Sequence, residues 1–225
     1  SENCDVTSCM FNEIGANAIF IHGEAVVPAT TKNINVTDCH ISNYGRIFNN
    51  AIGILLTHAS NCNLENNEIH DGWYTGISVG WNWGYSDNPT NNINISNNLI
   101  YNIGNGWLSD MGGIYTLGIQ PDTAIKGNII HNVGCDEGAY GYGGWGIYLD
   151  EGSSFMTVEK NSYDEMIEDD LTLGSHLKGT TLKSLLDYEY NATSYSLTTL
   201  DRPNYTIVLE KICEETIGEL IVFME

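Results

Sequence analysis

The chain has 225 residues, and its 29 acidic side chains against 8 basic ones give a formal net charge of −21. This charge argues against nucleic acid and anionic membrane surfaces as partners, because both are polyanions. No apolar run approaches the roughly 20 residues that cross a bilayer, and the start shows no basic segment followed by an apolar one, as a signal peptide would have.

A short pattern recurs about every thirty residues up to residue 163. It reads aliphatic, two variable residues, Asn or Cys, one variable residue, apolar, at 6–11, 36–41, 64–69, 95–100, 125–130 and 158–163. A small residue and a short apolar strand follow at 18–21, 53–56, 76–79, 113–116 and 146–149. Two strand signals per unit, separated by Gly and Asn turns, predict an all-β fold: a parallel β-helix of about five coils.

Stacking the units places the fourth residue of the pattern in one column, which contains Cys9, Cys39, Asn67, Asn98, Asn128 and Asn161. Coils stack about 4.7–4.9 Å apart, so the amides of an inward Asn column can hydrogen-bond along the stack. Cys9 and Cys39 fall in adjacent coils, where a disulfide is geometrically possible. We favour the alternative, two small buried thiols in asparagine positions.

The pattern ends near Asn161, and the residues that follow differ in composition. Leu177, Leu182, Leu185 and Leu186 have helical spacing, 203–210 reads as a strand, and 213–225 as the start of a helix. We therefore predict a β-helix domain over 1–162 and a short α/β segment over 163–225. Limited proteolysis should cut first between Asn161 and Leu177.

The strand that ends each coil predicts a candidate site. In register, its outward row contains Phe20, Leu55, Ser78, Tyr115 and Tyr148, and the rows beyond the strand ends contain His22, His58, Trp81, Asp150 and Glu151 over several glycines. Aromatic rings stack on the C–H faces of sugars, and carboxylates supply acid, base or nucleophile. Polar residues also occur at strand ends simply because turns are solvated.

Glycoside hydrolysis uses two carboxyls, about 5–5.5 Å apart for retention or roughly 6.5–9.5 Å for inversion. Asp110 is the predicted partner of Asp150. In extended segments the two would be offset by roughly 23 Å, so residues 104–113 must leave the ladder and arch over the strand face, which their glycines at 104, 106, 112 and 113 permit. Asp150 with Glu151 is an alternative pair, although neighbours on a strand face opposite sides. Asp110 could instead cap a turn.

A polysaccharide lyase is the rival enzyme on this pectin-lyase-type fold. Lyases of acidic pectins use calcium held by carboxylates and a basic residue that removes a proton. The repeat region has one arginine, Arg46, and three lysines, Lys32, Lys126 and Lys160, none of them near the acidic rows. This deficit makes the lyase interpretation weak.

Three strings of aromatic residues and glycines resemble a known family: "GWNWGYSDNP" (80–89), "LSDMGGIYTLGIQPDTAIKGNIIHNVG" (108–134) and "YGYGGWGIYLDEGSS" (140–154). They are similar to the right-handed parallel β-helix enzymes of glycoside hydrolase family 141, which includes α-L-fucosidases and xylanases. The resemblance covers about 60–160, and 1–59 fit as weaker preceding coils. It implies hydrolysis of a neutral plant-type glycan without a metal or other cofactor. The implied catalytic residues are Asp110 and Asp150, with Glu151 as alternative, and the substrate-binding candidates are Tyr115, Tyr148, Trp107, Trp145, Trp81 and His58.

The competing hypothesis is a non-catalytic carbohydrate-binding or structural solenoid. The expected partner is an oligo- or polysaccharide, with the protein a monomer located outside the cell or in the periplasm. The tail resembles the C-terminal part of bacterial glucose-6-phosphate isomerase over about 60 residues, a similarity that implies no catalytic residue here. A joined reading frame is the preferred explanation for this tail, and a genuine small capping domain is the alternative.

Overall fold

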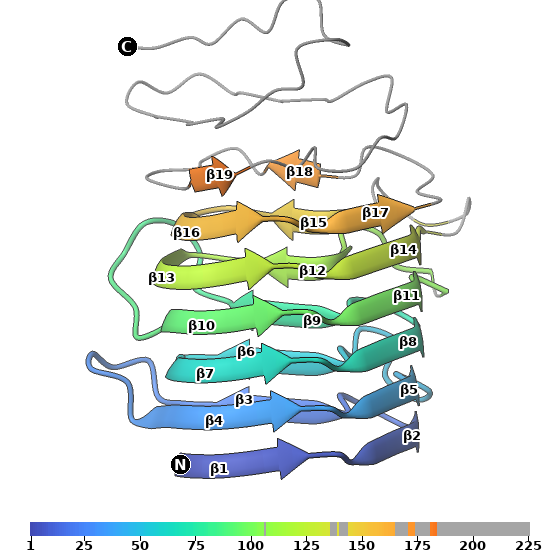
Figure 1. The fold of residues 1–225 in the computed structure, drawn as a ribbon, viewed down its shortest axis with the longest axis horizontal. Coiled ribbons are helices and arrows are strands. Elements are labelled where there is room, and N and C mark those ends of the chain that lie inside the picture. The colour runs from blue at the N-terminus through green and yellow to red at the C-terminus, as the bar shows by residue number, and fades with distance from the viewer. Residues whose placement is uncertain (106, 136–138, 140–143, 165–170, 174–180, 184–225) are drawn as a thin grey trace, which may run out of the picture.

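The computed structural model describes residues 1–105, 107–135, 139, 144–164, 171–173 and 181–183, in which every helix or strand position is a strand. Successive strands join three parallel sheets in turn, so that each coil stacks on the previous one (Figure 1). Sheet A contains β1 (Glu2–Thr7), β4 (Thr31–Thr37), β7 (Ala59–Glu65), β10 (Asn91–Ser96), β13 (Ile119–Lys126), β16 (Ser154–Glu159) and β19 (Thr181–Lys183). Sheet B contains β2 (Met10–Ile14), β5 (His40–Tyr44), β8 (Glu68–Gly72), β11 (Leu99–Ile103), β14 (Ile129–Val133) and β17 (Ser162–Asp164). Sheet C contains β3 (Ile19–His22), β6 (Ile54–Thr57), β9 (Ile77–Gly80), β12 (Gly112–Thr116), β15 (Trp145–Leu149) and β18 (Leu171–Leu173).

The predicted parallel β-helix is confirmed. The five strands predicted to end the coils all lie in sheet C, within one residue of the predicted bounds. Their register is also as predicted, because Phe20, Leu55, Ser78, Tyr115 and Tyr148 pair in sequence from β3 to β15.

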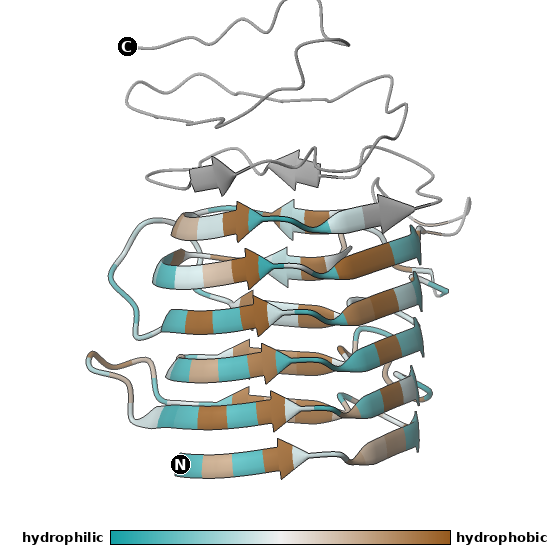
Figure 2. Cartoon of the chain, in the orientation of Figure 1, coloured by the Kyte–Doolittle hydropathy of each residue, from teal (hydrophilic) through white to brown (hydrophobic). Residues whose placement is uncertain are grey.

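Three columns of aliphatic side chains form the core, one from each sheet, and Figure 2 shows the hydrophobic positions recurring along the stack. Every member has no measurable exposure. The columns are Val36, Leu64, Ile95, Ile125 and Val158 in sheet A, Ile41, Ile69, Ile100 and Ile130 in sheet B, and Ile54, Ile77, Ile114 and Ile147 in sheet C. The first and last positions of the repeated pattern supply the sheet A and sheet B columns.

The corner between sheets A and B explains the central position of the pattern. The residue before each ladder position has a left-handed backbone, with φ between 53° and 62°, at Ser8, Asp38, Asn66, Asn97, Gly127 and Lys160. Asn and Gly adopt this conformation most readily. In the next position, the Oδ1 of Asn98 accepts hydrogen bonds from the backbone N and the Nδ2 of Asn67, both at 3.0 Å. The predicted Asn ladder is therefore confirmed.

The cysteines at the start of the ladder are free thiols. Cys39 is buried, and its Sγ lies 3.3 Å from the carbonyl oxygen of Thr37. Cys9 is exposed. The favoured thiol interpretation is confirmed, although only one of the two thiols is buried.

Parallel pairing continues beyond the predicted domain boundary. β18 pairs with β15, and β19 pairs with β16. Leu182 lies in β19, whereas the other three leucines at helical spacing and the segments predicted at 203–210 and 213–225 lie outside the described residues. The boundary at residue 163 stays a prediction. None of the described residues belongs to a helix that could span a membrane.

Candidate active site

Two carboxylates from neighbouring coils, Asp110 and Asp150, lie among tyrosine side chains. Asp150 follows β15, and its Oδ2 accepts a 2.6 Å hydrogen bond from the hydroxyl of Tyr115. Asp110 precedes β12, and both Asp110 and Asp150 lie near enough to Tyr148 to raise the pKa of its hydroxyl. The segment before β12 thus places Asp110 within electrostatic reach of Asp150, and the catalytic pairing of the two acids stays a prediction.

The electrostatics of the two acids differ. Partial desolvation raises the pKa of Asp110, the interaction with Tyr148 opposes this rise, and the charge of Asp150 adds to it. Burial and the same two carboxylates raise the pKa of Tyr148. Tyr115 also has a raised pKa, first because of burial and then because it bonds Asp150. The tyrosines therefore stay protonated as hydrogen-bond donors, and Asp110 retains its proton to higher pH than an ordinary aspartate.

Aromatic rings surround the carboxylates on the outer face of sheet C. Tyr115, Leu117, Trp145 and Tyr148 form a buried cluster against which Trp81 packs. The ring centroids of Trp145 and Tyr148 are 4.4 Å apart, and those of Tyr115 and Tyr148 are 5.1 Å apart. The Nε1 of Trp81 donates a 2.8 Å hydrogen bond to Ser78 Oγ, which fixes the indole beside Tyr115. The outer face here is thus an apolar floor beside two acids.

A loop over residues 81–90 lies across the ends of the next two coils. A Cβ added at Gly118 would lie 2.3 Å from the carbonyl oxygen of Asn82, and one added at Gly152 would lie 2.1 Å from that of Gly84. The Nδ2 of Asn88 also donates a 2.8 Å hydrogen bond to the carbonyl of Ile119. The glycines noted in the sequence therefore allow this aromatic loop to lie close to the strand ends.

Gly118→Ala should destabilise the protein because it combines a backbone at φ +85° with a Cβ overlapping the loop carbonyl. We expect a loss of about 2–5 kcal/mol in the free energy of unfolding, measured by urea denaturation. Gly84→Ala is the matched control, since Gly84 has φ +81° with nothing within 4 Å of an added Cβ. Equal losses in both variants would contradict the close approach of the loop.

The bend that positions Asp110 differs from the predicted one. Gly112 and Gly113 lie inside β12, where an added Cβ would approach the carbonyl oxygens of Trp145 and Gly146, so these glycines serve strand packing. The left-handed backbone lies instead at Gly104, with φ +92°, and at Asp110 itself, with φ 59°. Of the glycines predicted to permit the bend, Gly104 therefore has the required backbone, whereas the prediction was wrong for Gly112 and Gly113, because a strand glycine packed against its neighbour is not free to act as a hinge. Gly106 lies outside the described residues.

Tyr74 is a site residue that the sequence reasoning missed. Its hydroxyl donates a 2.9 Å hydrogen bond to the backbone carbonyl of Asp110. Burial, followed by the charge of Asp110, raises the pKa of Tyr74 to about 12, and the charge of Asp150 contributes further. Its place just before the "TGISV" strand, one coil before Asp110, is the only signal in the sequence.

Within the described part of the chain, the remaining predicted site residues form no hydrogen bond with the side chain of Asp110 or Asp150. Glu151 is exposed, and its carbonyl accepts a hydrogen bond from the Gly118 N–H. Trp107 is 72% exposed on the segment before Asp110. His58 packs edge-on against His22, with ring centroids 5.9 Å apart. Burial and the neighbouring His22 lower the pKa of His58.

The stacked coils agree with comparisons to known proteins. A family model described as "Right handed beta helix region" matches residues 1–162. The chain belongs to the right-handed β-helix family. A solved structure titled "Glycoside hydrolase" superposes with a TM-score of 0.71 at 25% sequence identity. The superposition covers 81% of this β-helix chain and 33% of that glycoside hydrolase, so the chain spans about a third of its structural neighbour. This likeness supports a carbohydrate-active role.

A second, partial similarity links the β-helix chain to glucose-6-phosphate isomerases. The isomerase of Carboxydothermus hydrogenoformans is 35% identical over 74 residues, which are 32% of this chain and 16% of that protein. The probable isomerase of Haloarcula marismortui is 43% identical over 51 residues, 23% of this chain and 12% of that protein. The resemblance to part of an isomerase is thus confirmed, over a small share of each relative.

Proposed function

We propose that the protein is a glycoside hydrolase that cleaves a neutral plant-type glycan, α-L-fucoside or xylan, with Asp110 and Asp150 as its carboxylate pair. The observation that carries the proposal is the placement of the two acids among neighbouring tyrosines: Tyr115 donates a 2.6 Å hydrogen bond to the Asp150 carboxylate, and Tyr74 donates one to the backbone carbonyl of Asp110. Most glycosidases use two carboxyl groups as catalytic residues, and the two groups have different environments. A plant polymer is met outside the cytoplasm, so the proposed location is extracellular or periplasmic.

The proposed roles follow from the environments of the two acids. Asp110, with its raised pKa, is the general acid that protonates the leaving-group oxygen. Asp150, oriented by the 2.6 Å hydrogen bond from Tyr115, is the nucleophile or the base that activates water. Trp81, which is only partly buried, and Trp107, which is 72% exposed, offer ring surfaces to the sugar.

Three observations favour a neutral glycan as the substrate. The chain carries a formal net charge of −21, which repels an acidic polymer. The acids stand beside an apolar cluster with Trp81 packed against it. Tyrosines lie beside both acids, and the charge of Asp150 acts on Asp110. A uronate would meet like charges here, whereas fucose or xylose would not.

Tyr148→Phe should move the basic limb of the pH profile of kcat/KM to higher pH. Activity falls as pH rises through the pKa of the general acid. Because the Tyr148 interaction lowers the pKa of Asp110, its removal raises that pKa and extends activity upward. Tyr115→Phe is the control, since its hydroxyl bonds Asp150, and the basic limb should stay in place. A downward shift in Tyr148→Phe would exclude Asp110 as the acid.

The direct test incubates the whole chain with aryl α-L-fucosides and xylo-oligosaccharides and follows product release. Turnover that is lost in Asp110→Asn and in Asp150→Asn supports the proposal. The competing function is a non-catalytic carbohydrate-binding solenoid, for which the accessible rings of Trp81 and Trp107 would suffice. Sugar binding without turnover, seen by tryptophan fluorescence, would favour that alternative.

A further inference from the structure

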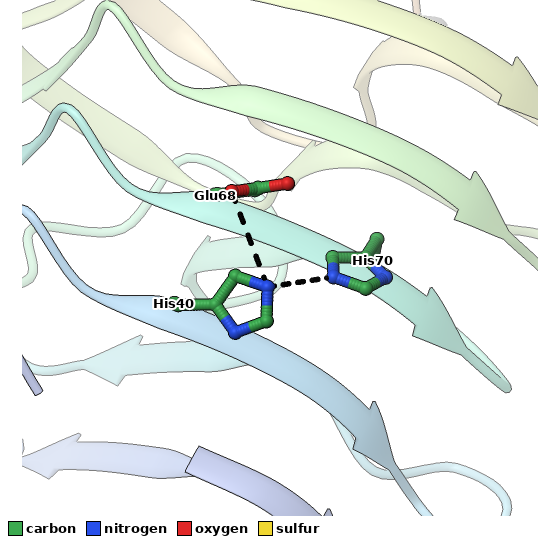
Figure 3. A group of neighbouring side chains, drawn as sticks. All are labelled: His40, Glu68 and His70. Carbon is green, nitrogen blue, oxygen red and sulfur yellow. Dashed lines mark hydrogen bonds and ion pairs between the residues drawn. The ribbon is translucent and has the colours of Figure 1, made fainter. Parts of the chain in front are cut away.

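Two histidines and a glutamate converge on the outer face of sheet B, away from the sheet C site (Figure 3). The Nε2 of His40 lies 2.9 Å from the Nε2 of His70 and 4.0 Å from the Oε2 of Glu68. Register explains the convergence, because His40 on β5 pairs directly with Glu68 on β8. His70 stands two residues further along β8, on the same face. Three potential metal ligands therefore point at one another from adjacent coils.

Neighbouring groups hold two of these ligands, His70 and Glu68, by their far atoms, whereas the buried Nδ1 of His40 has no hydrogen-bond partner among the described residues. The Nδ1 of His70 contacts the Oδ2 of Asp71 at 2.6 Å, and the Oδ1 of Asp71 accepts a 3.1 Å hydrogen bond from the Nδ2 of Asn102. The hydroxyl of Tyr101 donates a 2.8 Å hydrogen bond to the Oε1 of Glu68. Such outer partners fix the tautomer and the orientation of metal ligands in known sites. They leave the Nε2 of His70 and the Oε2 of Glu68 for the centre.

A ring stack further restrains the arrangement. Tyr101 lies between two imidazoles, with its ring centroid 4.6 Å from that of His70 and 5.1 Å from that of His131. Both pairs are nearly parallel, at 7° and 3°. The imidazole of His70 is thereby held both by Asp71 and by an aromatic face. A ligand held in this way loses little conformational freedom when it binds an ion.

The donor set matches a borderline transition metal. Two imidazole nitrogens and one carboxylate oxygen bind Zn²⁺ at about 2.0–2.2 Å, with water in the fourth position. Tetrahedral geometry at those lengths needs the two nitrogens about 3.3 Å apart. The observed 2.9 Å needs only a small opening of the pair. Without an ion, the two facing nitrogens must share one proton.

We propose that His40, His70 and Glu68 form a binding site for a divalent transition-metal ion of the Zn²⁺ class. The ion would join the second and third strands of sheet B, β5 and β8, from outside the core. This position lets it clamp two coils together without contact with Asp110 or Asp150.

The test titrates the metal-free whole chain with Co²⁺, followed by visible absorption, and with Zn²⁺, followed by calorimetry and thermal unfolding. For the wild-type chain we expect one bound ion and an increase in Tm on metal addition. The His40→Ala/His70→Ala double variant should neither bind the ion nor gain in Tm. His131→Ala is the matched control, because it removes the other ring that stacks on Tyr101 and no ligand. Asp71→Asn should weaken binding by about 10–100-fold.

Three outcomes would overturn the proposal. One is the absence of Co²⁺ binding by the wild-type chain. Another is undiminished binding in the double variant, which with thiolate absorption bands would place the ion on the exposed Cys4 and Cys9. The third is a loss of metal binding in His131→Ala equal to that in the double variant, because this would show that the substitutions act through ring packing rather than through loss of a ligand.

Discussion

Asp110→Asn is expected to lower kcat on a cleaved glycoside by about 10²–10⁴-fold while the protein stays folded. The amide cannot supply the proton that the raised pKa of Asp110 keeps available. The backbone should tolerate the change, because Asn accepts the observed φ of 59° as readily as Asp does. The hydrogen bond from Tyr74 goes to the main-chain carbonyl and survives. Initial rates on the glycosides that the wild type cleaves measure the effect.

The stability of this variant provides a second measurement with a definite sign. The pKa of Asp110 is raised in the folded protein, so its protonated form stabilises the fold at low pH, and that contribution is lost as pH rises through the raised pKa. A neutral Asn at this position should therefore unfold no earlier than wild type at neutral pH. Asp122→Asn, at another exposed left-handed position with φ 61°, is the control for the substitution itself. An active but destabilised Asp110→Asn protein would instead identify a turn-capping aspartate.

Asn98→Ala should lower the free energy of unfolding by about 3–5 kcal/mol, since it leaves two buried backbone groups without partners. The Oδ1 of Asn98 accepts from the backbone N–H of Asn67 at 3.0 Å. Its Nδ2 donates to the carbonyl of Leu64 at 2.9 Å. Asn98 is 1% exposed, so water cannot replace these bonds without entering the core. Urea denaturation followed by circular dichroism measures the loss.

Asn63→Ala is the matched control for the ladder. Asn63 is exposed on sheet A, and its Nδ2 donates a 2.7 Å hydrogen bond to Asn35 Oδ1. Water can replace an exposed hydrogen bond, so we expect a loss of about 0.5 kcal/mol or less. Similar losses in the two variants would show that the inner ladder contributes no more than the outer amides.

Much of the fold could be predicted because a solenoid repeats its local chemistry. Each coil meets only its neighbours, so a pattern such as "ISNNLI" specifies its own core positions, Ile95 and Ile100, and its own corner residue, Asn98. The register of sheet C followed from the same repeat, and Tyr115 was placed correctly beside Tyr148. The isomerase-like tail lacks this repeat, so its structure could not be predicted in the same way.

The site was predicted only in part, because segments between the paired strands have no strand register from which the positions of their residues could be predicted. The sequence identified Asp110 and Asp150, but spacing alone left them roughly 23 Å apart. The left-handed backbone at Asp110 and the hydrogen bond from Tyr74 place Asp110 where the charge of Asp150 influences its pKa.

By itself, then, the sequence determined the coil period, the core columns and the Asn ladder, since these depend on contacts between equivalent residues of adjacent coils. Only the tertiary structure decided which loop carboxylate meets Asp150. It also decided that His40, Glu68 and His70 converge, because convergence depends on side-chain direction and on partners such as Asp71. Backbone bends and side-chain rotamers are set by packing across coils, which a linear repeat does not encode.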